Sequence, residues 1–532
     1  MHRQHSSRRT SEWTLVLAAC SILLASVVSD GRAQLANIPY EIAPLNAPFP
    51  MPELTRPVFP DRTFDIRDYG AVPAGEDGEP ATAAIQRTIE AASAAGGGTV
   101  LIPAGEWLTG PIHLRSNINL HVAEGAIVRF STNRDDYLPV VRVRYEGVEA
   151  YNYSPLIYAN GATNVALTGG GVLDGQGRHW WEWARQYGAQ PRMIATKEPL
   201  SRRAFGKGAG MEGMRPNFAV FFDCENVLIE GITLNDTPMW NVHLVYTRNA
   251  IVRGITVNSL QAPNGDGVVI DSSRNVLVEY NTLRTGDDAV VLKSGLNEEG
   301  LQINIPTENV IVRNYEALDV RTGSGGVVFG SETSGGIRNV YVHNALFAGS
   351  DRGIRFKTER GRGNVIENIF IHDIVMRDIN IEAITVNTFY TGPQAQGPSP
   401  AIRNVQIRNV EVDGARTGIS LVGLPEKWLE NFVMEDVTIR NTVQGARITR
   451  VKNLVLTNVD IQSTERALVF DDVLEISLSN VRLSDEQDGP PMALQGRYTG
   501  AVYLNDYPTD QAVFEAGATP AVVLTEPFVQ AW

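Results

Sequence analysis

The most regular feature of the sequence is a short phrase in which an Asn is followed by alternating apolar residues. Alternation with a period of two is typical of a β-strand that buries one face. Most successive phrases begin 22 to 36 residues apart, so each phrase predicts one coil of a longer repeat. The phrases begin at Asn164, Asn226, Asn249, Asn275, Asn309, Asn339, Asn368, Asn404 and Asn453.

Strands that follow strands at this spacing predict an all-β solenoid, a single-stranded right-handed parallel β-helix. A leucine-rich repeat is the rival solenoid, but its units alternate strand with helix and are dominated by Leu. The units here are rich in Val and Ile, and we expect no helix between them. The repeated Asn has a structural explanation, because stacked Asn side chains can satisfy polar groups in successive turns.

The segment before the repeats predicts a cap for the end of the solenoid. Ala81 to Ala95 has Ile85, Ile89 and Ala92 on one helical face, and three glycines stop the helix. A stack of strands would otherwise expose an apolar end, so we expect this helix to cover it. Just before it, Phe64-Asp65-Ile66 predicts a strand.

The N-terminal 60 residues predict two further segments. Residues 1–33 have a basic start with three arginines, then an apolar run and a small-residue end, which is the form of a secretory signal peptide. This segment predicts export to the periplasm or outside the cell. Leu17-Ala18-Ala19-Cys20 also resembles a lipoprotein processing site, so a lipid anchor at Cys20 is the alternative. Residues 34–60 contain seven prolines, typical of an extended arm or linker. Residues 61–532 remain for the β-helix domain.

Charge and cysteine content narrow the class of partner. Without residues 1–33 the chain carries 42 Lys and Arg residues against 58 Asp and Glu residues, a net charge of −16. That balance disfavours a nucleic-acid partner. Only Cys224 remains, so no intramolecular disulfide is expected, and the eight histidines form no cluster with metal-ligand spacing. We expect a monomer with no second apolar span and no cofactor.

Two coils place acidic residues beside glycines, in Asn264-Gly265-Asp266-Gly267 and Gly286-Asp287-Asp288. Asp266 precedes Asp287 by 21 residues and Asp288 by 22, about one coil, so the three acids should stack on neighbouring coils roughly 4.8 Å apart. Crowded carboxylates favour retention of a proton at neutral pH. A protonated acid beside an ionised one is what glycosidic-bond cleavage requires.

Solvated turn residues or calcium ligands are the alternative explanation for these acids. Arg355-Phe356-Lys357 favours the catalytic one, because alternation puts Arg355 and Lys357 on the same face of one strand. Two cations one or two coils beyond the acids could hold a substrate carboxylate. The combination predicts a site for an acidic sugar.

Over residues 63–530 the sequence resembles glycoside hydrolase family 28, the polygalacturonase family. The motifs of that family resemble Asn-Thr-Asp, Gly-Asp-Asp, Gly-His-Gly and Arg-Ile-Lys in this order. Here they correspond to Asn264-Gly265-Asp266, Gly286-Asp287-Asp288, Gly323-Ser324-Gly325 and Arg355-Phe356-Lys357, flanked by Lys293-Ser294-Gly295 and Gly330-Ser331-Glu332.

The resemblance implies a pectin-lyase-like β-helix that hydrolyses α-1,4-galacturonosyl bonds of pectin with inversion. Asp287 would protonate the leaving oxygen, and Asp266 with Asp288 would deprotonate water. Asn264 would line the site, while Arg355, Lys357 and Tyr390 would bind the sugar carboxylate. A carboxylate separation near 5 Å is typical of retention, so the predicted stacking conflicts with the implied inversion.

Two departures from the family pattern affect the expected substrate. Gly265 replaces a Thr, and Ser324 replaces a His thought to tune the acid or contact sugar. Ser324 at this substrate-binding position makes rhamnogalacturonan or another pectic backbone an alternative substrate. His243 and His343 lie in strand phrases, where we expect packed or surface residues.

Insertions favour action from a chain end. Tyr145 to Tyr158 resembles bacterial exo-acting members of the family, in which such insertions wall off one end of the cleft. Residues 178–215 carry eight basic residues against three acidic ones and include Trp180, Trp181 and Trp183. They could attract a polyanion or form a loop with solvated charges.

Two other functions fit the β-helix less well. The sequence lacks the motifs of a pectic lyase, and a non-catalytic carbohydrate-binding β-helix would not need three stacked acids.

Overall fold

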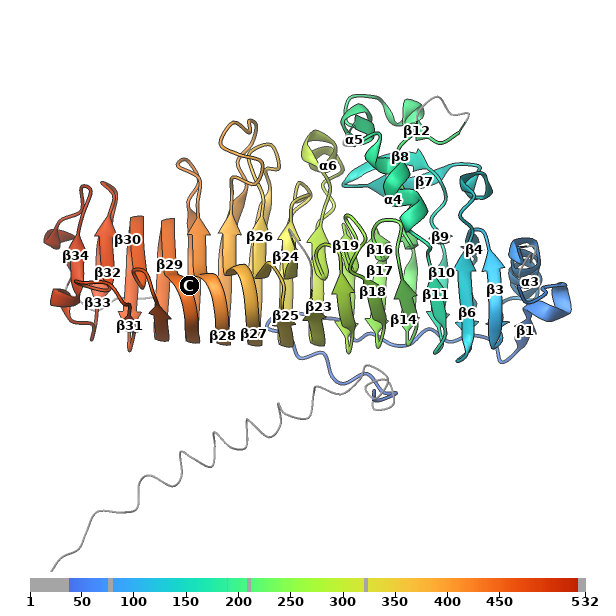
Figure 1. Ribbon diagram of the computed structural model, residues 1–532, viewed down its shortest axis with the longest axis horizontal. Coiled ribbons are helices and arrows are strands. Elements are labelled where there is room, and N and C mark those ends of the chain that lie inside the picture. Colours follow the sequence, from blue (N-terminus) through green and yellow to red (C-terminus); the bar gives the residue numbers. More distant parts are fainter. Residues whose placement is uncertain (1–37, 75–79, 189, 208–211, 320–323, 525–532) are drawn as a thin grey trace, which may run out of the picture. The chain divides into compact units, whose positions relative to one another are not determined.

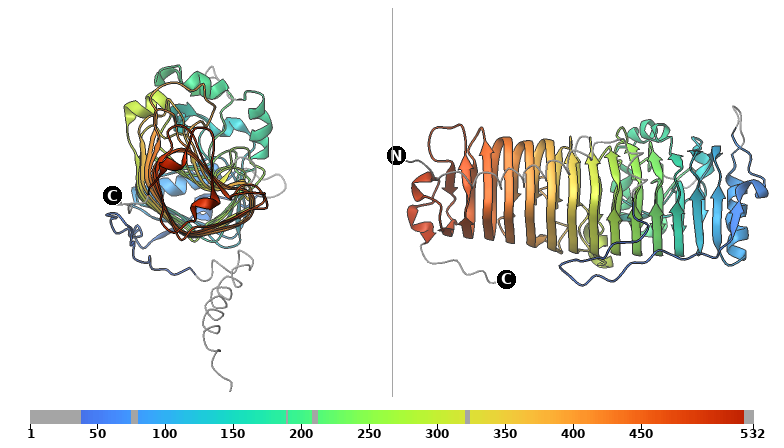
Figure 2. Two further views of the ribbon diagram at one scale, coloured as in Figure 1. Left: turned by 90° about the vertical axis from the view of Figure 1, so that its left-hand side faces the viewer. Right: turned by 90° about the horizontal axis from the view of Figure 1, so that it is seen from below.

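The computed structural model of the protein describes residues 38–74, 80–188, 190–207, 212–319 and 324–524. Ala43–Trp532 forms one compact unit. This unit is a right-handed parallel β-helix, in which the strands of successive coils lie side by side along one axis (Figures 1 and 2). The predicted fold class is confirmed. The signal peptide predicted for residues 1–33 lies outside the described residues.

Three parallel sheets run along the β-helix. The first, called the site sheet, carries the candidate catalytic residues. Its short strands are β4 (Ile112–Leu114), β9 (Ile157–Asn160), β13 (Ala219–Phe222), β16 (Val242–Val245), β19 (Val268–Asp271), β22 (Val290–Lys293), β24 (Gly325–Gly330), β26 (Arg352–Lys357), β32 (Met492–Gln495) and β34 (Ala512–Phe514).

The second and third sheets complete each coil. The second contains β1 (Thr63–Asp65), β2 (Gly98–Ile102), β5 (Ile118–Val122), β10 (Thr163–Thr168), β14 (Glu225–Glu230), β17 (Arg248–Arg253), β20 (Arg274–Glu279), β33 (Gly500–Leu504) and β35 (Val523–Leu524). The third contains β3 (Gly105–Thr109), β6 (Ala126–Phe130), β11 (Val172–Asp174), β15 (Thr233–Asn235), β18 (Thr256–Ser259), β21 (Thr282–Thr285) and β31 (Arg482–Ser484).

In the later coils the strands run on around the corners and contribute to more than one sheet. They are β23 (Thr307–Leu318), β25 (Ile337–Ala348), β27 (Val365–Asn387), β28 (Ala401–Val422), β29 (Leu429–Ser463) and β30 (Leu468–Ser479). Apolar side chains that point inward from all three sheets form one continuous core from the first coil to the last. The alternation in the sequence thus corresponds to inward and outward positions.

The repeated Asn side chains form a ladder along the β-helix. Each Asn has φ between 53° and 61°, a left-handed conformation that Asn tolerates better than most residues. Each Nδ2 donates to the Oδ1 of the Asn one coil earlier, over 2.8 to 3.3 Å. The ladder also includes Asn117 and Asn431, and the structural explanation of the repeated Asn is correct.

The N-terminal end of the stack is covered by α3 (Thr82–Ala94), which buries Ile85, Ile89 and Ala92 against the first strands. The predicted capping helix is confirmed. The predicted strand at Phe64–Ile66 ends one residue early, because Ile66 begins the 3-10 helix η1 (Ile66–Tyr69). Asp65 caps this helix through a hydrogen bond from the Arg67 backbone N–H.

Helices also interrupt the repeats, contrary to the expectation that no helix lies between them. α6 (Asn297–Ile303) separates β22 from β23, and Glu298 and Glu299 in its first turn complement the helix dipole. Residues 178–215, called the insertion, contain α4 (Arg178–Arg185), α5 (Gln190–Ala195) and η3 (Leu200–Arg202). A small separate sheet joins β7 (Val141–Tyr145), β8 (Val148–Asn152) and β12 (Ala204–Phe205), above the strands β16 to β19 in Figure 1.

The described part of the Pro-rich segment contains no helix or strand between residues 43 and 60, and it lies along the β-helix (blue in Figure 2). Arg56 binds both carboxylate oxygens of Glu230 at 2.5 and 2.6 Å. Farther along, Arg313 donates to the carbonyl oxygens of Ala43 and Pro44. Residues 43–60, called the arm, are therefore fastened to coils far from them in sequence.

Between these two contacts of the arm, the second sheet carries a row of buried or half-buried charges of alternating sign. Glu230, Arg253, Glu279 and Arg313 occupy successive coils. Arg253 lies 3.0 Å from Glu279 and 3.5 Å from Glu230, and Arg313 lies 2.8 Å from Glu279. Each charge therefore has an opposite charge on a neighbouring coil, and the arm supplies the partners at both ends.

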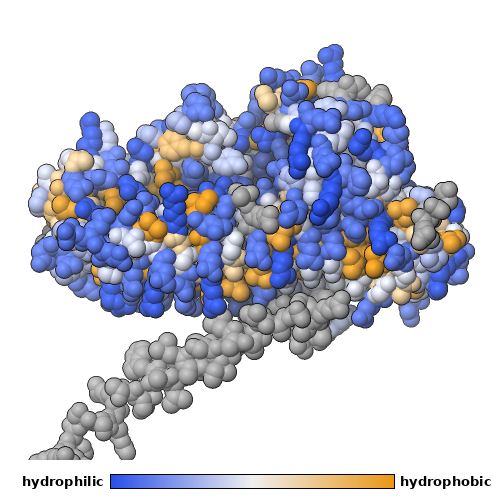
Figure 3. All heavy atoms as spheres, in the orientation of Figure 1, coloured by the Kyte–Doolittle hydropathy of each residue, from blue (hydrophilic) through white to orange (hydrophobic). Residues whose placement is uncertain are grey.

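The outer surface suits a protein that buries its apolar side chains inside the coils. The face in Figure 3 is largely hydrophilic, with apolar residues in separate spots. None of the helices in the described residues is both long and apolar enough to cross a membrane. Cys224 is buried and free.

Candidate active site

The three aspartates lie where the chain bends from the third sheet into the site sheet. Asp266 comes just before β19, and Asp287 with Asp288 comes just before β22. The backbone N–H of Gly267 donates to the Asp288 carbonyl oxygen at 2.9 Å, so the two acidic segments occupy adjacent coils, as the spacing predicts. Asp266 and Asp288 are buried, and Asp287 is half-buried.

Glycines beside the acids allow these bends to pack closely. A Cβ added at Gly286 would lie 2.0 Å from the carbonyl oxygen of Ala262, and one at Gly265 would lie 2.7 Å from the Ala262 Cβ. Neither bend has room for a side chain. At Gly265, where the family has a Thr, a side chain would collide with Ala262 of the same turn.

Two cations from a strand two coils away reach Asp288. Lys357 Nζ lies 2.6 Å from Asp288 Oδ2, and Arg355 Nη1 lies 3.6 Å from Asp288 Oδ1. Both side chains therefore point outward from β26 to the same side, as alternation predicts. Tyr390 is 38% exposed, and its ring lies 5.6 Å from Lys357 Nζ and 5.9 Å from Arg355 Cζ. The structure gathers these residues in one cluster with Asp288.

A third cation, Lys293, lies beside Asp266; in the sequence it appeared only as a residue that flanks a motif. Lys293 Nζ is 3.5 Å from Asp266 Oδ2 and 2.9 Å from Glu332 Oε2. It also lies 4.7 Å from the ring centre of Trp240. Lys293, Glu332 and Trp240 thus belong to the site. The sequence pointed to Lys293 and Glu332 only through their positions beside the family motifs.

Burial and charge shift the pKa values of this cluster. Burial raises the pKa of Asp287 to about 6, and the neighbouring Asp288 acts in the same direction. Burial also raises the pKa of Asp266, which Lys293 opposes. Burial alone would raise the pKa of Glu332, but Lys293 outweighs it and holds that pKa well below its usual range. The cluster thus combines two carboxyls with raised pKa values, Asp266 and Asp287, with a carboxylate, Glu332, whose pKa Lys293 lowers.

Asn264 lies at the exposed rim of the site, next to the insertion. Its Oδ1 accepts a hydrogen bond from Arg215 Nη2 at 2.7 Å. Arg215 Nη1 also donates to the carbonyl oxygens of Pro238 and Pro263. Arg215 is buried, and this fork fixes the loop that leads into Asp266.

Ser324 lies at the start of β24 and is fully buried. Its carbonyl oxygen accepts from the backbone N–H of Arg352, which belongs to the strand that carries Arg355. The preceding Gly323 lies outside the described residues. The Ser324 side chain does not face solvent, unlike Tyr390 and Asn264.

A buried polar network anchors the β7–β8 hairpin beside the site. Arg144 Nη1 donates to Asp271 Oδ1 at 2.9 Å and to Ser272 Oγ at 2.8 Å. Asp271 Oδ2 lies 3.5 Å from His243 Nε2, and His243 packs edge-on against Trp240. Burial lowers the pKa of His243. His243 is thus a packed residue, as expected, and His343 is half-buried.

The basic insertion is less electropositive than its composition suggests. Trp180, Trp181 and Trp183 are buried, and five of its cations have carboxylate partners. These pairs are Arg178–Asp236, Arg192–Glu146, Arg202–Glu198, Arg203–Glu299 and Lys207–Asp135. The local charge reversal is therefore largely neutralised, and the insertion acts mainly as a packed body beside the site.

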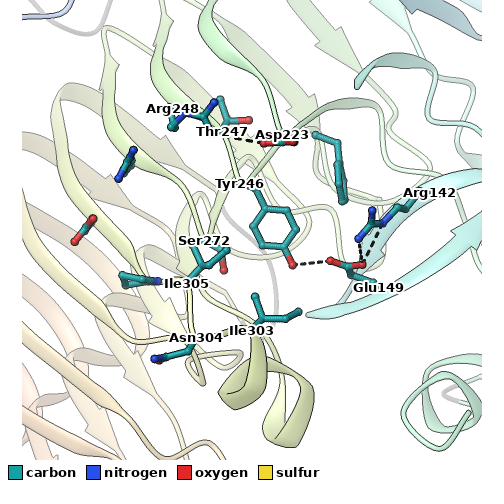
Figure 4. Close-up of a pocket in the computed structure, with 14 residues that line it drawn as sticks. Arg142, Glu149, Asp223, Tyr246, Thr247, Arg248, Ser272, Ile303, Asn304 and Ile305 are labelled. Atoms are coloured by element: carbon teal, nitrogen blue, oxygen red, sulfur yellow. Dashed lines mark hydrogen bonds and ion pairs between the residues drawn. The ribbon is translucent and has the colours of Figure 1, made fainter. Parts of the chain in front are cut away.

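A cavity of about 580 Å³ lies beside the β7–β8 hairpin, whose Arg142 and Glu149 line it (Figure 4). Its charged groups satisfy one another: Tyr246 donates to Glu149 at 2.8 Å, and Arg142 binds the same carboxylate. None of the three aspartates lines it. The titratable cluster lies elsewhere, at Asp266, Asp287 and Asp288.

Among the described residues, no group of three or more His, Cys, Asp or Glu side chains is arranged to hold a metal ion. The chemistry of the site rests on carboxyls, ammonium and guanidinium groups. A parallel β-helix with such a cluster on its outer face defines a class, the β-helical proteins of the glycoside hydrolase type.

Comparison with known proteins gives the family. The model of "Glycosyl hydrolases family 28" matches residues 204–457. An exopolygalacturonase structure from Thermotoga maritima is 36% identical with a TM-score of 0.71, over 76% of this chain and 93% of that one. The chain belongs to glycosyl hydrolase family 28.

Two curated relatives extend the comparison. A "Probable polygalacturonase" of Vitis vinifera is 31% identical over 289 residues, which is 53% of this chain and 54% of that protein. An "Exo-poly-alpha-D-galacturonosidase" of Dickeya chrysanthemi is 25% identical over 62% of this chain and 57% of that protein. The chain thus spans little more than half the length of these relatives.

Proposed function

We propose that the protein hydrolyses α-1,4-galacturonosyl bonds in polygalacturonate. One observation carries the proposal: a carboxyl whose pKa is raised to about 6, Asp287, adjoins a carboxylate, Asp288, that is paired with Lys357. A proton donor beside an ionised partner is the arrangement that acid-catalysed glycoside cleavage needs. Family membership and the names of the similar proteins support the choice of bond.

In this mechanism Asp287 gives its proton to the leaving oxygen as the bond to the anomeric carbon breaks. Asp266 and Asp288 hold a water molecule, and Asp288, paired with Lys357, accepts its proton while the water oxygen bonds to the anomeric carbon. Asp266, whose pKa is raised by burial, orients that water from beside Lys293. The new bond forms opposite the one that breaks, so the configuration inverts.

Recognition of the sugar acid falls to Arg355, Lys357 and Tyr390. A guanidinium and an ammonium group supply charge-assisted hydrogen bonds to a carboxylate, and the partly exposed Tyr390 ring offers a face to the sugar. The Lys357 ammonium is already paired with Asp288, so a bound uronate would share it. Asn264 contributes at the rim, where Arg215 orients it.

We further propose that the enzyme acts from a chain end. The β7–β8 hairpin and the insertion lie on the N-terminal side of the acids, and the buried Arg144–Asp271 pair anchors the hairpin there. This body would block the substrate on that side and leave the cleft open toward the C-terminal coils. The relatives from Thermotoga maritima and Dickeya chrysanthemi are named as exo-acting.

Rhamnogalacturonan or another pectic backbone is the second candidate substrate, and Ser324 favours it. A buried Ser at this position provides neither the charge nor the volume of a histidine ring. The proposal further includes export directed by residues 1–33 and action on plant cell-wall polysaccharide outside the cytoplasm. It also includes a monomeric β-helix domain, residues 61–532, preceded by the Pro-rich segment 34–60.

The deciding experiment is product analysis on polygalacturonate and rhamnogalacturonan side by side. We expect one small product from polygalacturonate in the first minutes, a slow fall in viscosity and inversion at the anomeric carbon by proton NMR. Rapid viscosity loss with mixed oligomers would refute chain-end action. Cleavage of rhamnogalacturonan alone would favour the second candidate, and ultraviolet absorbance from an unsaturated sugar would indicate a lyase.

A further inference from the structure

The outward side chains of the site sheet form rows along the β-helix because each strand pairs in register with the next. Arg447 of β29 stands in the same row as Arg355, three coils farther toward the C-terminal end. Thr385 and Ser420 occupy the two positions between them. At about 4.8 Å per coil, the two arginine positions are on the order of 14 Å apart along the axis.

A cavity of about 290 Å³ surrounds Arg447 on this row. Its floor includes Val469 and Ala493, which continue the row on the next two coils. Gln444 and Gln495 are among the polar residues that line it. We call this the distal cavity. An apolar floor bordered by amide and guanidinium groups suits a sugar ring, whose faces are apolar and whose edges carry hydroxyls.

The two acids of the distal cavity are already paired. Glu465 accepts a hydrogen bond from Gln444 Nε2 at 2.9 Å, and Glu515 lies 2.9 Å from Arg466 Nη1. Arg447 is exposed, and no carboxylate in the described part of the chain lies within ion-pair distance of its guanidinium. It is therefore the group in the cavity that is available for an incoming anion.

We propose that the distal cavity is a binding subsite for a galacturonosyl residue of the substrate, with the sugar carboxylate on Arg447. This inference rests on the proposed function and extends it. The substrate chain would run from the acids over Arg355 and along the open row, away from the hairpin. Arg447 would then hold a uronate several sugars from the bond that is cleaved.

Such a subsite has a length requirement that the catalytic site lacks. A disaccharide bound at the acids is too short to span three further coils, whereas a chain of six or more sugars can reach Arg447. Contact with Arg447 therefore adds affinity only for long ligands. Because the contact is a partly solvated ion pair, the gain should shrink as salt is raised.

The test measures binding to the full-length Asp287→Asn protein, which is expected to retain substrate, by isothermal titration calorimetry with digalacturonate and hexagalacturonate. Adding Arg447→Ala should weaken hexagalacturonate binding about two- to fivefold and leave digalacturonate unchanged. The matched control is Arg440→Ala, because Arg440 is exposed on the part of β29 that belongs to the third sheet. The control should change neither affinity.

Unchanged hexagalacturonate binding in Arg447→Ala would overturn the subsite and leave the proposed function standing. Equal weakening for both ligands would also overturn it, because a disaccharide cannot contact Arg447. If Asp287→Asn binds neither oligomer, the proposed function and the subsite fail together. A length-dependent loss that disappears at high salt is the supporting result.

Discussion

The ammonium group of Lys357 lies 2.6 Å from Oδ2 of Asp288, although the two residues are 69 positions apart in the chain. Both side chains are buried, and two coils separate their strands. The pair thus joins the strand expected to bind the sugar acid to the segment expected to activate water. It also gives a buried carboxylate a partner of opposite charge.

Replacing Lys357 should therefore affect stability as well as activity. Lys357→Ala leaves Asp288 buried with only the more distant Arg355, and we expect the free energy of unfolding to fall by about 3 kcal/mol. Chemical denaturation measures this. Lys452→Ala, at the exposed pair of Lys452 with Glu475, is the control and should change stability by less than about 0.5 kcal/mol. Equal effects at the two lysines would show that the buried pair has no special role.

Asp287→Asn should reduce kcat about a thousandfold, because an amide cannot donate a proton to the leaving oxygen as a carboxylic acid does. The side chain is half-buried, and its Oδ1 accepts a hydrogen bond from the backbone N–H of Asp288. An Asn can accept the same bond, so the melting temperature should be almost unchanged. A variant that keeps more than a tenth of wild-type turnover would remove Asp287 from this role.

The pH profile follows from the raised pKa of Asp287. As the general acid it must carry its proton, so kcat/KM should be highest below pH 6 and fall as pH rises through the pKa of about 6. An unshifted aspartate would lose its proton two pH units lower, near its ordinary value. Initial rates between pH 4 and 8 locate this limb. A rate that stays constant up to pH 8 would contradict the assignment.

Ser324→His restores the residue expected from the family pattern. Because Ser324 is fully buried and the β24 coil packs closely on β26, the larger ring should displace neighbouring backbone. We expect lower stability and lower activity on every pectic substrate, measured by thermal unfolding and by product release. Ser324→Ala serves as the size-matched control. Higher polygalacturonate activity in the histidine variant would show that the site retains room for the ring.

Much of the fold was predictable because one residue type marks each coil. Asn164 and its successors adopt left-handed φ values at equivalent corners, so the repeat length could be read directly from their spacing. The insertions followed no such period. α6 was missed because Asn297–Ile303 is a single short helix between two strands, too brief to establish a helical repeat of apolar positions.

The candidate site was predictable where neighbouring residues carry the motif, and less so where partners come from distant coils. Asp287 and Asp288 stand together beside Gly286, which is a local pattern. Glu332 pairs with Lys293 across 39 positions, and Arg144 reaches Asp271 across 127. Such pairs depend on which strands become neighbours and on inserted hairpins, and no local pattern of residues specifies either.

The arm has a consequence for the order of folding. Arg56 is 174 residues from Glu230, and the carbonyl oxygens of Ala43 and Pro44 are about 270 residues from Arg313. Closing such long loops costs more conformational entropy than pairing successive coils, so the coils should assemble first. The first residues of the arm to be synthesised would thus be among the last to dock. A chain without the arm should still form its coils but leave Glu230 and Arg313 each short of a partner.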